Sequence, residues 1–465
     1  MHNSILKNIS WQTLYQFLAS GLGLLFNIIL ARTISQFEFG TFNYIISILS
    51  ISTLFLELGI PTYFWRKWST DISKINQDIS SYLVGRVGIA IPISFFLFFY
   101  VFFIDRFVSL EFLLAYIYFL LDIFVQPTRL FFSSQNKYHK TFIIDGLERC
   151  ISLGLGILLL ILHYPLRKVF LGFIFGRLTS ILLCYVLNKN VRSLSFSFKG
   201  IRNIIHLSIP LFMIGIFSTL YFRIDTLMIR YLLGMQDVAI YMAAYRLLDG
   251  GALIPGILTT ATMPLIVKLY HDKEKKKLTL LFHNMMIVLA IPALYIASVC
   301  LLFAPNIIPL IFGPEFNSSI QILRVLGLSS VLLFLTYPLT HFMVANKQET
   351  YYVKVLVLLT VTNIVFNILL IPKIGILGSA LATLLCELLS LIFLYHKVQI
   401  KIPIKIFLKL FFSIFIATLI TLMLPFPWYI NIFCLGILYC CILLIVKIVT
   451  IQEVFLYLRG ILVND

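Results

Sequence analysis

The chain of 465 residues is 60% hydrophobic and 12% charged, and its formal net charge is +17. Soluble domains average about 45–50% apolar and about 25% charged residues. The composition therefore excludes a soluble protein and indicates a polytopic membrane protein. A large positive charge also occurs in nucleic-acid-binding proteins, but the distribution of the cations along this chain argues against nucleic acid as a partner.

Membrane-spanning helices need about 20 consecutive, mostly apolar residues. The first such segment follows Lys7, is too long for the apolar core of a signal peptide and has no small-residue cleavage site after it. We therefore expect it to be retained. In all, fourteen segments predict an all-α fold of about 14 transmembrane helices: 10–31, 40–62, 81–103, 110–132, 142–162, 168–188, 204–229, 239–266, 279–302, 319–344, 352–371, 375–396, 405–424 and 429–449.

Lysine and arginine are concentrated in alternate connections between these segments. With a cytoplasmic N-terminus, the cytoplasmic segments and the span ends beside them hold 24 Lys and Arg, the outer segments and their span ends hold six, and the interiors of the spans hold six. The positive-inside rule then predicts that both termini are cytoplasmic. The run HDKEKKK at 271–277 is accordingly expected to be a cytoplasmic loop beside anionic lipid head groups, not a nucleic-acid site.

Two segments of the chain resemble each other. ARTISQFEFGTFNYI (31–45) follows the first span, and IRYLLGMQDVAIYMAAY (229–245) follows the seventh. Six spans separate the two copies, so both halves have the same orientation, and transporters with such parallel repeats bind substrate between the halves. Aligned with one gap, three residue pairs match: Arg32 with Arg230, Glu38 with Asp237, and Phe42 with Tyr241.

The repeat predicts the domain organisation. Gly250, Gly251, Pro255 and Gly256 in the eighth span, and Pro210 in the seventh, can break or bend their helices and so let one lobe rock against the other. Close helix packing at these small residues is the other interpretation. The predicted parts are an N-terminal six-helix lobe at 1–188, a cytoplasmic linker at 189–203, a C-terminal six-helix lobe at 204–396, and two extra transmembrane helices with a cytoplasmic tail at 397–465.

Four stretches resemble segments of one family of transporters. They are LELGIP (56–61), FRIDTLMIRYLLGMQDVAIYMAAYRLLD (222–249), FAPNIIPLIFGPEFNSSIQILRVL (303–326) and NILLIPKIGILGSALAT (367–383). In order and spacing they resemble the Wzx-type O-antigen and polysaccharide-unit flippases of the MOP (MATE-like) superfamily. The resemblance implies two pseudo-symmetric six-helix bundles around a central cavity. It also implies translocation of undecaprenyl-pyrophosphate-linked oligosaccharide from the inner to the outer leaflet of the bacterial cytoplasmic membrane, with polysaccharide polymerase or chain-length machinery as candidate protein partners.

Ionisable side chains inside the predicted spans are the candidates for a functional site. Each costs at least about 2.5 kcal/mol when it faces lipid, so each must face a partner or a cavity. Asp145 with Arg149, and Arg246 with Asp249, have the spacing of pairs within one helix. Ionisable residues without an opposite charge at such a spacing are the cations Arg86, Arg177, Arg223 and Arg324 and the acids Glu57, Asp122, Asp225 and Glu387.

Two interpretations of the four unpaired arginines remain open. Pairing with acids across helices would make them structural. Alternatively, they line the cavity and bind the pyrophosphate, because guanidinium is planar, permanently charged and bidentate toward phosphate oxygens. The second interpretation gives these candidates: Arg223, Arg86, Arg324 and then Arg177 for the pyrophosphate, Arg32 and Arg230 for the outer rim, and Asp225 and Glu57 for coupling to an H⁺ or Na⁺ gradient.

Motifs of enzymes are absent from the sequence. It contains no P-loop, no H-E-x-x-H, no G-x-S-x-G and no D-x-D, and its seven cysteines lack metal-ligand spacing. We therefore expect neither enzymatic activity nor a cofactor or metal.

Three other functions remain as alternatives. A cation-coupled multidrug exporter of the same superfamily would need an acidic cavity, and a lipid II flippase would use a closely related substrate. A membrane glycosyltransferase or polymerase would need catalytic acids on an outer loop, whereas the longest such loop, 303–318, has only Glu315.

Overall fold

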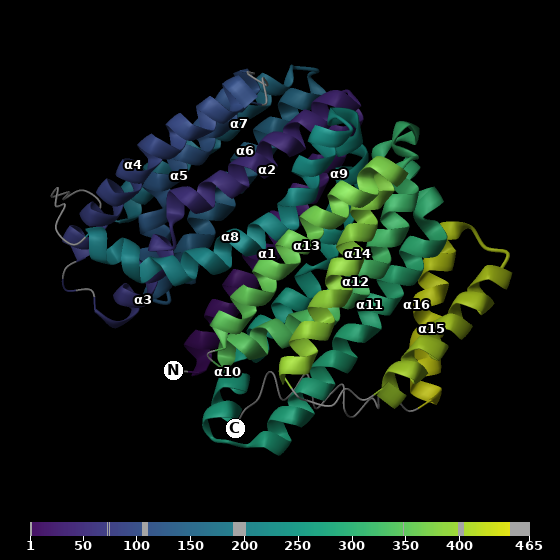
Figure 1. Ribbon diagram of the computed structural model, residues 1–465. Helices are drawn as coiled ribbons and strands as arrows, with labels where there is room; N and C mark the ends of the chain where they lie inside the picture. The colour runs from purple at the N-terminus through teal and green to yellow at the C-terminus, as the bar shows by residue number, and fades with distance from the viewer. Residues whose placement is uncertain are drawn as a thin grey trace. The chain divides into compact units, whose positions relative to one another are not determined.

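The computed structural model describes residues 2–71, 73, 75–104, 110–188, 201–346, 348–398 and 404–446. Within these ranges all regular structure is helical (Figure 1). Thirteen helical stretches of the described chain are long and apolar enough to cross a membrane. These findings confirm the predicted all-α polytopic membrane fold.

The chain divides into two compact units, Met1–Ala239 and Ile240–Asp465. In the first unit α6 packs on α1 and α7, α5 packs on α7, and α2 packs on α8. The elements of this unit are α1 (His2–Thr33), α2 (Gln36–Glu57), α3 (Ile60–Thr70), α4 (Ile75–Phe99), a π-helical turn (Tyr100–Ile104), α5 (Leu110–Ser134), α6 (Tyr138–Ile161), α7 (Leu166–Leu187), α8 (Ile201–Leu232) and the start of α9 (Met235–Gly251).

In the second unit α12 packs on α11, α10 and α14, and α14 also packs on α13. The last two helices pack on each other and on α11. The elements are the rest of α9, α10 (Leu253–His271), α11 (Lys275–Phe312), a 3₁₀ turn (Pro314–Phe316), α12 (Ser319–Ala345), α13 (Glu349–Ile374), α14 (Ile376–Val398), α15 (Ile404–Met423) and α16 (Trp428–Ile445).

The units divide later in the chain than the predicted linker at 189–203. Helix α8, which the sequence assigns to the C-terminal lobe, packs on α2 and α3 and is therefore counted with the first unit. The linker itself lies outside the described residues. The assignment of spans to two six-helix lobes stays a prediction.

The segments that begin the two predicted repeats have matching helical structure. Helices α1 and α8 are each 32 residues long. A two-residue connection follows each of them, and the next helix begins at Gln36 in one case and at Met235 in the other. Glu38 and Asp237, which match in sequence, both lie in the first turn of the following helix. The two copies therefore have the same local fold.

Three expected spans differ in detail from the structure. Residues 142–162 do form a helix, α6, but its Asp145, Glu148 and Arg149 keep it out of the thirteen apolar stretches. The expected span 239–266 is interrupted between α9 and α10, at Ala252, beside Gly250 and Gly251. The expected span 40–62 ends at Glu57, because Leu58 and Gly59 adopt left-handed conformations (φ 45° and 72°) that stop α2.

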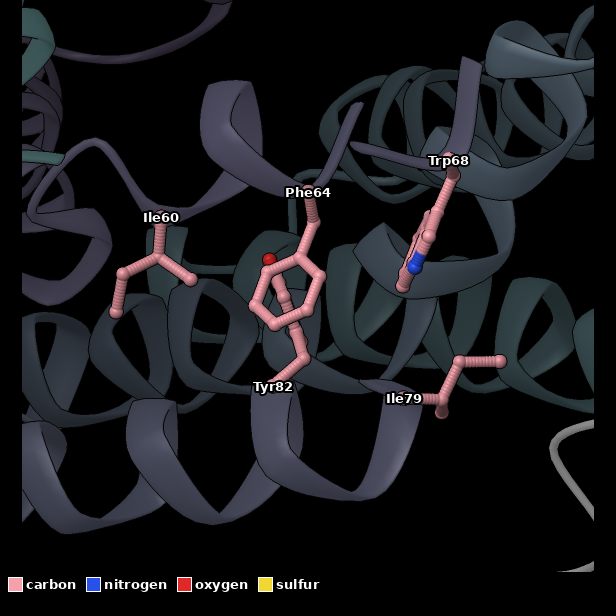
Figure 2. Packing of buried hydrophobic residues seen from close by; sticks show 5 residues of the cluster. All are labelled: Ile60, Phe64, Trp68, Ile79 and Tyr82. Carbon is pink, nitrogen blue, oxygen red and sulfur yellow. The ribbon is translucent and has the colours of Figure 1, made fainter. Parts of the chain in front are cut away.

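After this stop the chain forms α3, a short amphipathic helix that the sequence reading did not separate from the span. Pro61 lies in its first turn, where a missing backbone N–H costs nothing. Its Ile60, Phe64 and Trp68 recur every four residues, so they share one face. Figure 2 shows this face packed on Ile79 and Tyr82 of α4.

Candidate functional site

A cluster of eight ionisable side chains lies inside the first unit, and we call it the charge cluster. Helices α2, α4, α5, α6 and α7 each contribute at least one member. Acids and bases are equal in number, so the cluster is formally neutral. Its members are Glu57, Asp122, Asp145, Glu148, Arg86, Arg129, Arg149 and Arg177.

Asp122 of α5 is the centre of one half of this cluster. Its carboxylate accepts from Arg177 of α7 at 2.8 Å and also from Arg129, about two turns further along α5. Arg129 lies 3.4 Å from Asp145 of α6. Arg177 also lies 3.8 Å from Glu148, so two guanidinium groups and three carboxylates join three helices.

Neutral side chains complete this half. The Arg177 guanidinium lies 4.5 Å from the centroid of the Tyr118 ring, and the Tyr118 hydroxyl donates to Glu148 at 2.9 Å. Ser152 donates to the same carboxylate at 3.1 Å. Ion pairs of this kind, with their remaining oxygens bonded, are the arrangement in which buried charges are stable.

Arg86 of α4 is the centre of the other half. It is 1% exposed and donates to the Tyr82 hydroxyl at 2.7 Å and to the Gln126 side-chain oxygen. The Gln126 amide donates in turn to Glu57 at 2.6 Å. Arg86 therefore reaches an acid only through an amide, and its Nε has no hydrogen-bond partner among the described residues.

These contacts bear on the interpretation of Arg177. Arg177 pairs across helices, with Asp122 and Glu148, as the structural interpretation expects. The predicted pair of Asp145 with Arg149 is wrong, since Asp145 pairs with Arg129, and no ion pair joins Asp145 to Arg149 in the described part of the chain.

Helix α8 carries two of the predicted site residues near the middle of a spanning stretch. Arg223 is half-buried, and within the described part of the chain its side chain has no recorded hydrogen bond or ion pair. Asp225 is 3% exposed. Two residues apart on an α-helix, their side chains point to nearly opposite sides, so the environment of Arg223 differs from that of Asp225.

The two arginines predicted for the outer rim differ in exposure. Arg32, in the last turn of α1, is exposed, whereas Arg230, in the last turn of α8, is half-buried. The guanidinium of Arg230 lies 5.8 Å from the centroid of the Tyr44 ring. Arg230 is thus held against α2 by its aromatic neighbour.

The second unit holds fewer ionisable groups in its spans. Arg246 and Asp249 form the predicted pair within α9, at 3.4 Å. Arg324 of α12 is half-buried, and its Nε donates to the Leu301 carbonyl of α11 at 3.1 Å. No acid lies within ion-pair distance of Arg324 among the described residues. Glu387 of α14 is buried.

Sequence reasoning missed several members of the charge cluster and their partners. Arg129 was counted with the cytoplasmic connection at the end of the span 110–132, but α5 continues through Pro127 to Ser134, and Arg129 donates to Asp122 on the same helix. Asp122, Gln126 and Arg129 are spaced four and three residues apart, which places them on one helical face. That spacing is the signal that could have found them. Glu148 and the two tyrosines, Tyr82 and Tyr118, had no comparable signal.

Comparison with known proteins agrees with the fold. Residues 5–270 match the model of a family described as polysaccharide biosynthesis proteins, and residues 210–369 match the MatE family. An uncharacterized membrane protein of Methanocaldococcus jannaschii is 24% identical over 435 residues, which cover 83% of this chain and 82% of that protein.

Two further similarities concern flippases. The probable flippase AglR of Haloferax volcanii is 31% identical over 173 residues, covering 36% of this chain and 35% of that protein. The solved structure of the lipid II flippase MurJ matches with a TM-score of 0.78 and 17% identity, covering 93% of this chain and 97% of that one. Together with the family models, these matches confirm the resemblance found in the sequence. The chain belongs to the polysaccharide biosynthesis protein family and is a flippase-like membrane transporter of the MOP superfamily.

Proposed function

We propose that this chain moves oligosaccharides linked to undecaprenyl pyrophosphate from the inner to the outer leaflet of the bacterial cytoplasmic membrane. The cargo is a repeat unit of O-antigen or another surface polysaccharide, and transport proceeds by alternating access between two lobes. Membership of the polysaccharide biosynthesis family supports the cargo class. The excess of Lys and Arg in alternate connections supports cytoplasmic termini.

The main support for this proposal is the environment of Arg223. This side chain is a half-buried guanidinium inside the spanning stretch Phe212–Leu232, and no carboxylate of the described residues neutralises it. An unneutralised arginine in a span costs at least about 2.5 kcal/mol where it faces lipid. A pyrophosphate supplies the missing negative charge, and its oxygens match the planar fork of donors.

The other predicted pyrophosphate ligands differ in their burial and in their acidic partners. Arg324 lacks an acidic partner within the described residues and remains a candidate contact. Arg86 is covered on all sides in this conformation, so it can reach a ligand only after α4 or α5 moves. Arg177 is bound by two carboxylates, and we assign it to holding α5, α6 and α7 together.

Coupling to an ion gradient would need a carboxylate that can change its charge. Glu57 is bonded to Gln126, which links it to Arg86. Asp225 is buried on the helix that carries Arg223, so protonation or Na⁺ binding there would act on the same helix as the proposed pyrophosphate contact. We therefore rank Asp225 before Glu57 as the coupling residue. Polysaccharide polymerase or chain-length machinery stays a proposed protein partner.

Binding of a polyprenyl diphosphate sugar to the purified protein in nanodiscs tests the role of Arg223. Hydrogen bonds to charged groups contribute about 1.5–3 kcal/mol, so Arg223→Ala should weaken binding roughly 10- to 150-fold. Arg223→Lys should restore part of it, because a point charge replaces a bidentate fork. Arg167→Ala, at the exposed start of α7, is the matched control and should bind as the unmodified protein does.

Two results would contradict the proposal. Unchanged affinity of Arg223→Ala would remove Arg223 from the site. Preferential binding of a hydrophobic cation over the diphosphate would favour a multidrug exporter instead.

A further inference from the structure

Helix α3 begins where a membrane-spanning helix ends. The two left-handed residues Leu58 and Gly59 turn the chain sharply between α2 and α3. Unlike its neighbours, α3 is only 11 residues long and is too short to cross a membrane. Amphipathic helices that do not span can lie at the membrane interface, and the place of α3 directly after the end of a span favours that depth.

The buried face of α3 is fixed by polar bonds as well as by packing. Asp78 of α4 accepts from Lys67 at 2.6 Å and from the Trp68 indole at 3.1 Å. Gln135, after the end of α5, donates to the Trp68 carbonyl at 2.8 Å. Together with the apolar contacts in Figure 2, these bonds fix the rotation of α3 about its own axis. Its opposite face is therefore a preformed surface.

That opposite face presents an aromatic and a cationic side chain. Trp65 is 38% exposed and Arg66 is exposed, and neither side chain has a polar partner in the described part of the chain. Gln135 brings the connection between α5 and α6 beside α3, and Lys137 in this connection is exposed. The nearby exposed acid, Asp71, accepts from the backbone of Ser73 at the far end of α3.

We propose that the Trp65–Arg66 face of α3 binds the phosphate-bearing head groups of anionic phospholipids. Tryptophan is enriched at the membrane interface because its ring is apolar and its N–H is polar. Guanidinium binds phosphate oxygens, and basic side chains beside a span attract anionic lipid. Both connections involved are predicted to be cytoplasmic. This inference does not depend on which solute the protein transports.

Quenching of tryptophan fluorescence by brominated phospholipids tests it with the full chain in vesicles. The probes are phosphatidylcholine and phosphatidylglycerol brominated near the head group. The signal of Trp65 is the difference between the unmodified protein and Trp65→Phe, since Trp11, Trp68 and Trp428 also fluoresce.

We expect both lipids to quench the fluorescence of Trp65. Phosphatidylglycerol should bind about fivefold more strongly than phosphatidylcholine, because one basic side chain near an anionic surface contributes about 1 kcal/mol of attraction. Arg66→Gln should remove the preference while quenching itself remains. Arg66→Lys should keep the preference, and Arg167→Gln, on α7, should not change it. A Trp65 signal that no brominated lipid quenches would overturn the proposal, because α3 would then face water. Equal quenching by the two lipids in the unmodified protein would overturn it as well.

Discussion

Replacing Asp122 with asparagine should destabilise the first unit far more than the loss of an ordinary ion pair. Asp122 accepts from both Arg129 and Arg177, and its side chain is only 16% exposed. Asparagine has nearly the same shape but no charge. The substitution therefore removes a carboxylate that neutralises both Arg129 and Arg177.

The size of the effect follows from burial. Removing one partner of a buried pair costs about 3–5 kcal/mol. For a unit of 150–250 residues each kcal/mol lowers Tm by about 2–4 °C, so Asp122→Asn should lower Tm by roughly 6–20 °C. The control is Glu274→Gln in the second unit. Glu274 pairs with Lys277 at 2.6 Å, but these side chains are 39% and 70% exposed, and pairs at the surface contribute about 0–1 kcal/mol.

Thermal unfolding of the detergent-purified protein, followed by size-exclusion chromatography after heating, measures both shifts. The double variant Asp122→Asn/Arg177→Gln should recover part of the lost Tm, because it restores the balance of charge. The reasoning would be refuted if Asp122→Asn melts within a few degrees of Glu274→Gln. It would also be refuted if the loss of Tm in the double variant exceeds the sum of the losses in Asp122→Asn and Arg177→Gln. In either case the cluster would not be a buried, balanced network.

Two further substitutions test the packing of each unit. Gly40→Val should prevent folding or abolish transport, because a Cβ at residue 40 would overlap the backbone carbonyl of Met235. The control is Gly23→Ala on α1, where a Cβ meets nothing within 4 Å and folding and transport should be unchanged. Equal yields of folded protein from the two variants would contradict the close approach of α2 to Met235. Tyr295→Phe should lower Tm by roughly 1–6 °C, because it removes a 3.0 Å hydrogen bond from α11 to the Ile432 carbonyl of α16, worth about 0.5–1.5 kcal/mol. The exposed Tyr429→Phe is the control, and an unchanged Tm for Tyr295→Phe would show that the bond does not hold the last two helices to α11.

The fold could be predicted largely from the sequence because a membrane imposes strong constraints. Each span requires about 20 apolar residues, and these runs are visible without tertiary information. Local stops were harder. The end of α2 at Leu58 and Gly59 falls inside an apolar run, and only the combination of Gly59 and Pro61 signals a new helix there.

The candidate site was predictable only where partners lie on one helix. Arg246 and Asp249 are three residues apart, and their pair was found. Arg129 of α5 pairs with Asp145 of α6. Asp145 therefore does not pair with Arg149, which lies four residues further along its own helix. Which acids and bases meet across helices depends on helix rotation and packing, and sequence spacing does not contain this information.

Transport of the cargo itself tests the central claim most directly. Vesicles containing the protein and a fluorescent undecaprenyl diphosphate oligosaccharide can be treated with a membrane-impermeant reductant that bleaches only the outer leaflet. We predict that the unmodified protein and Arg167→Ala expose the inner-leaflet pool much faster than protein-free vesicles do, and that Arg223→Ala does not. Exposure by Arg223→Ala at the rate of the unmodified protein, or no acceleration by the unmodified protein, would contradict the account.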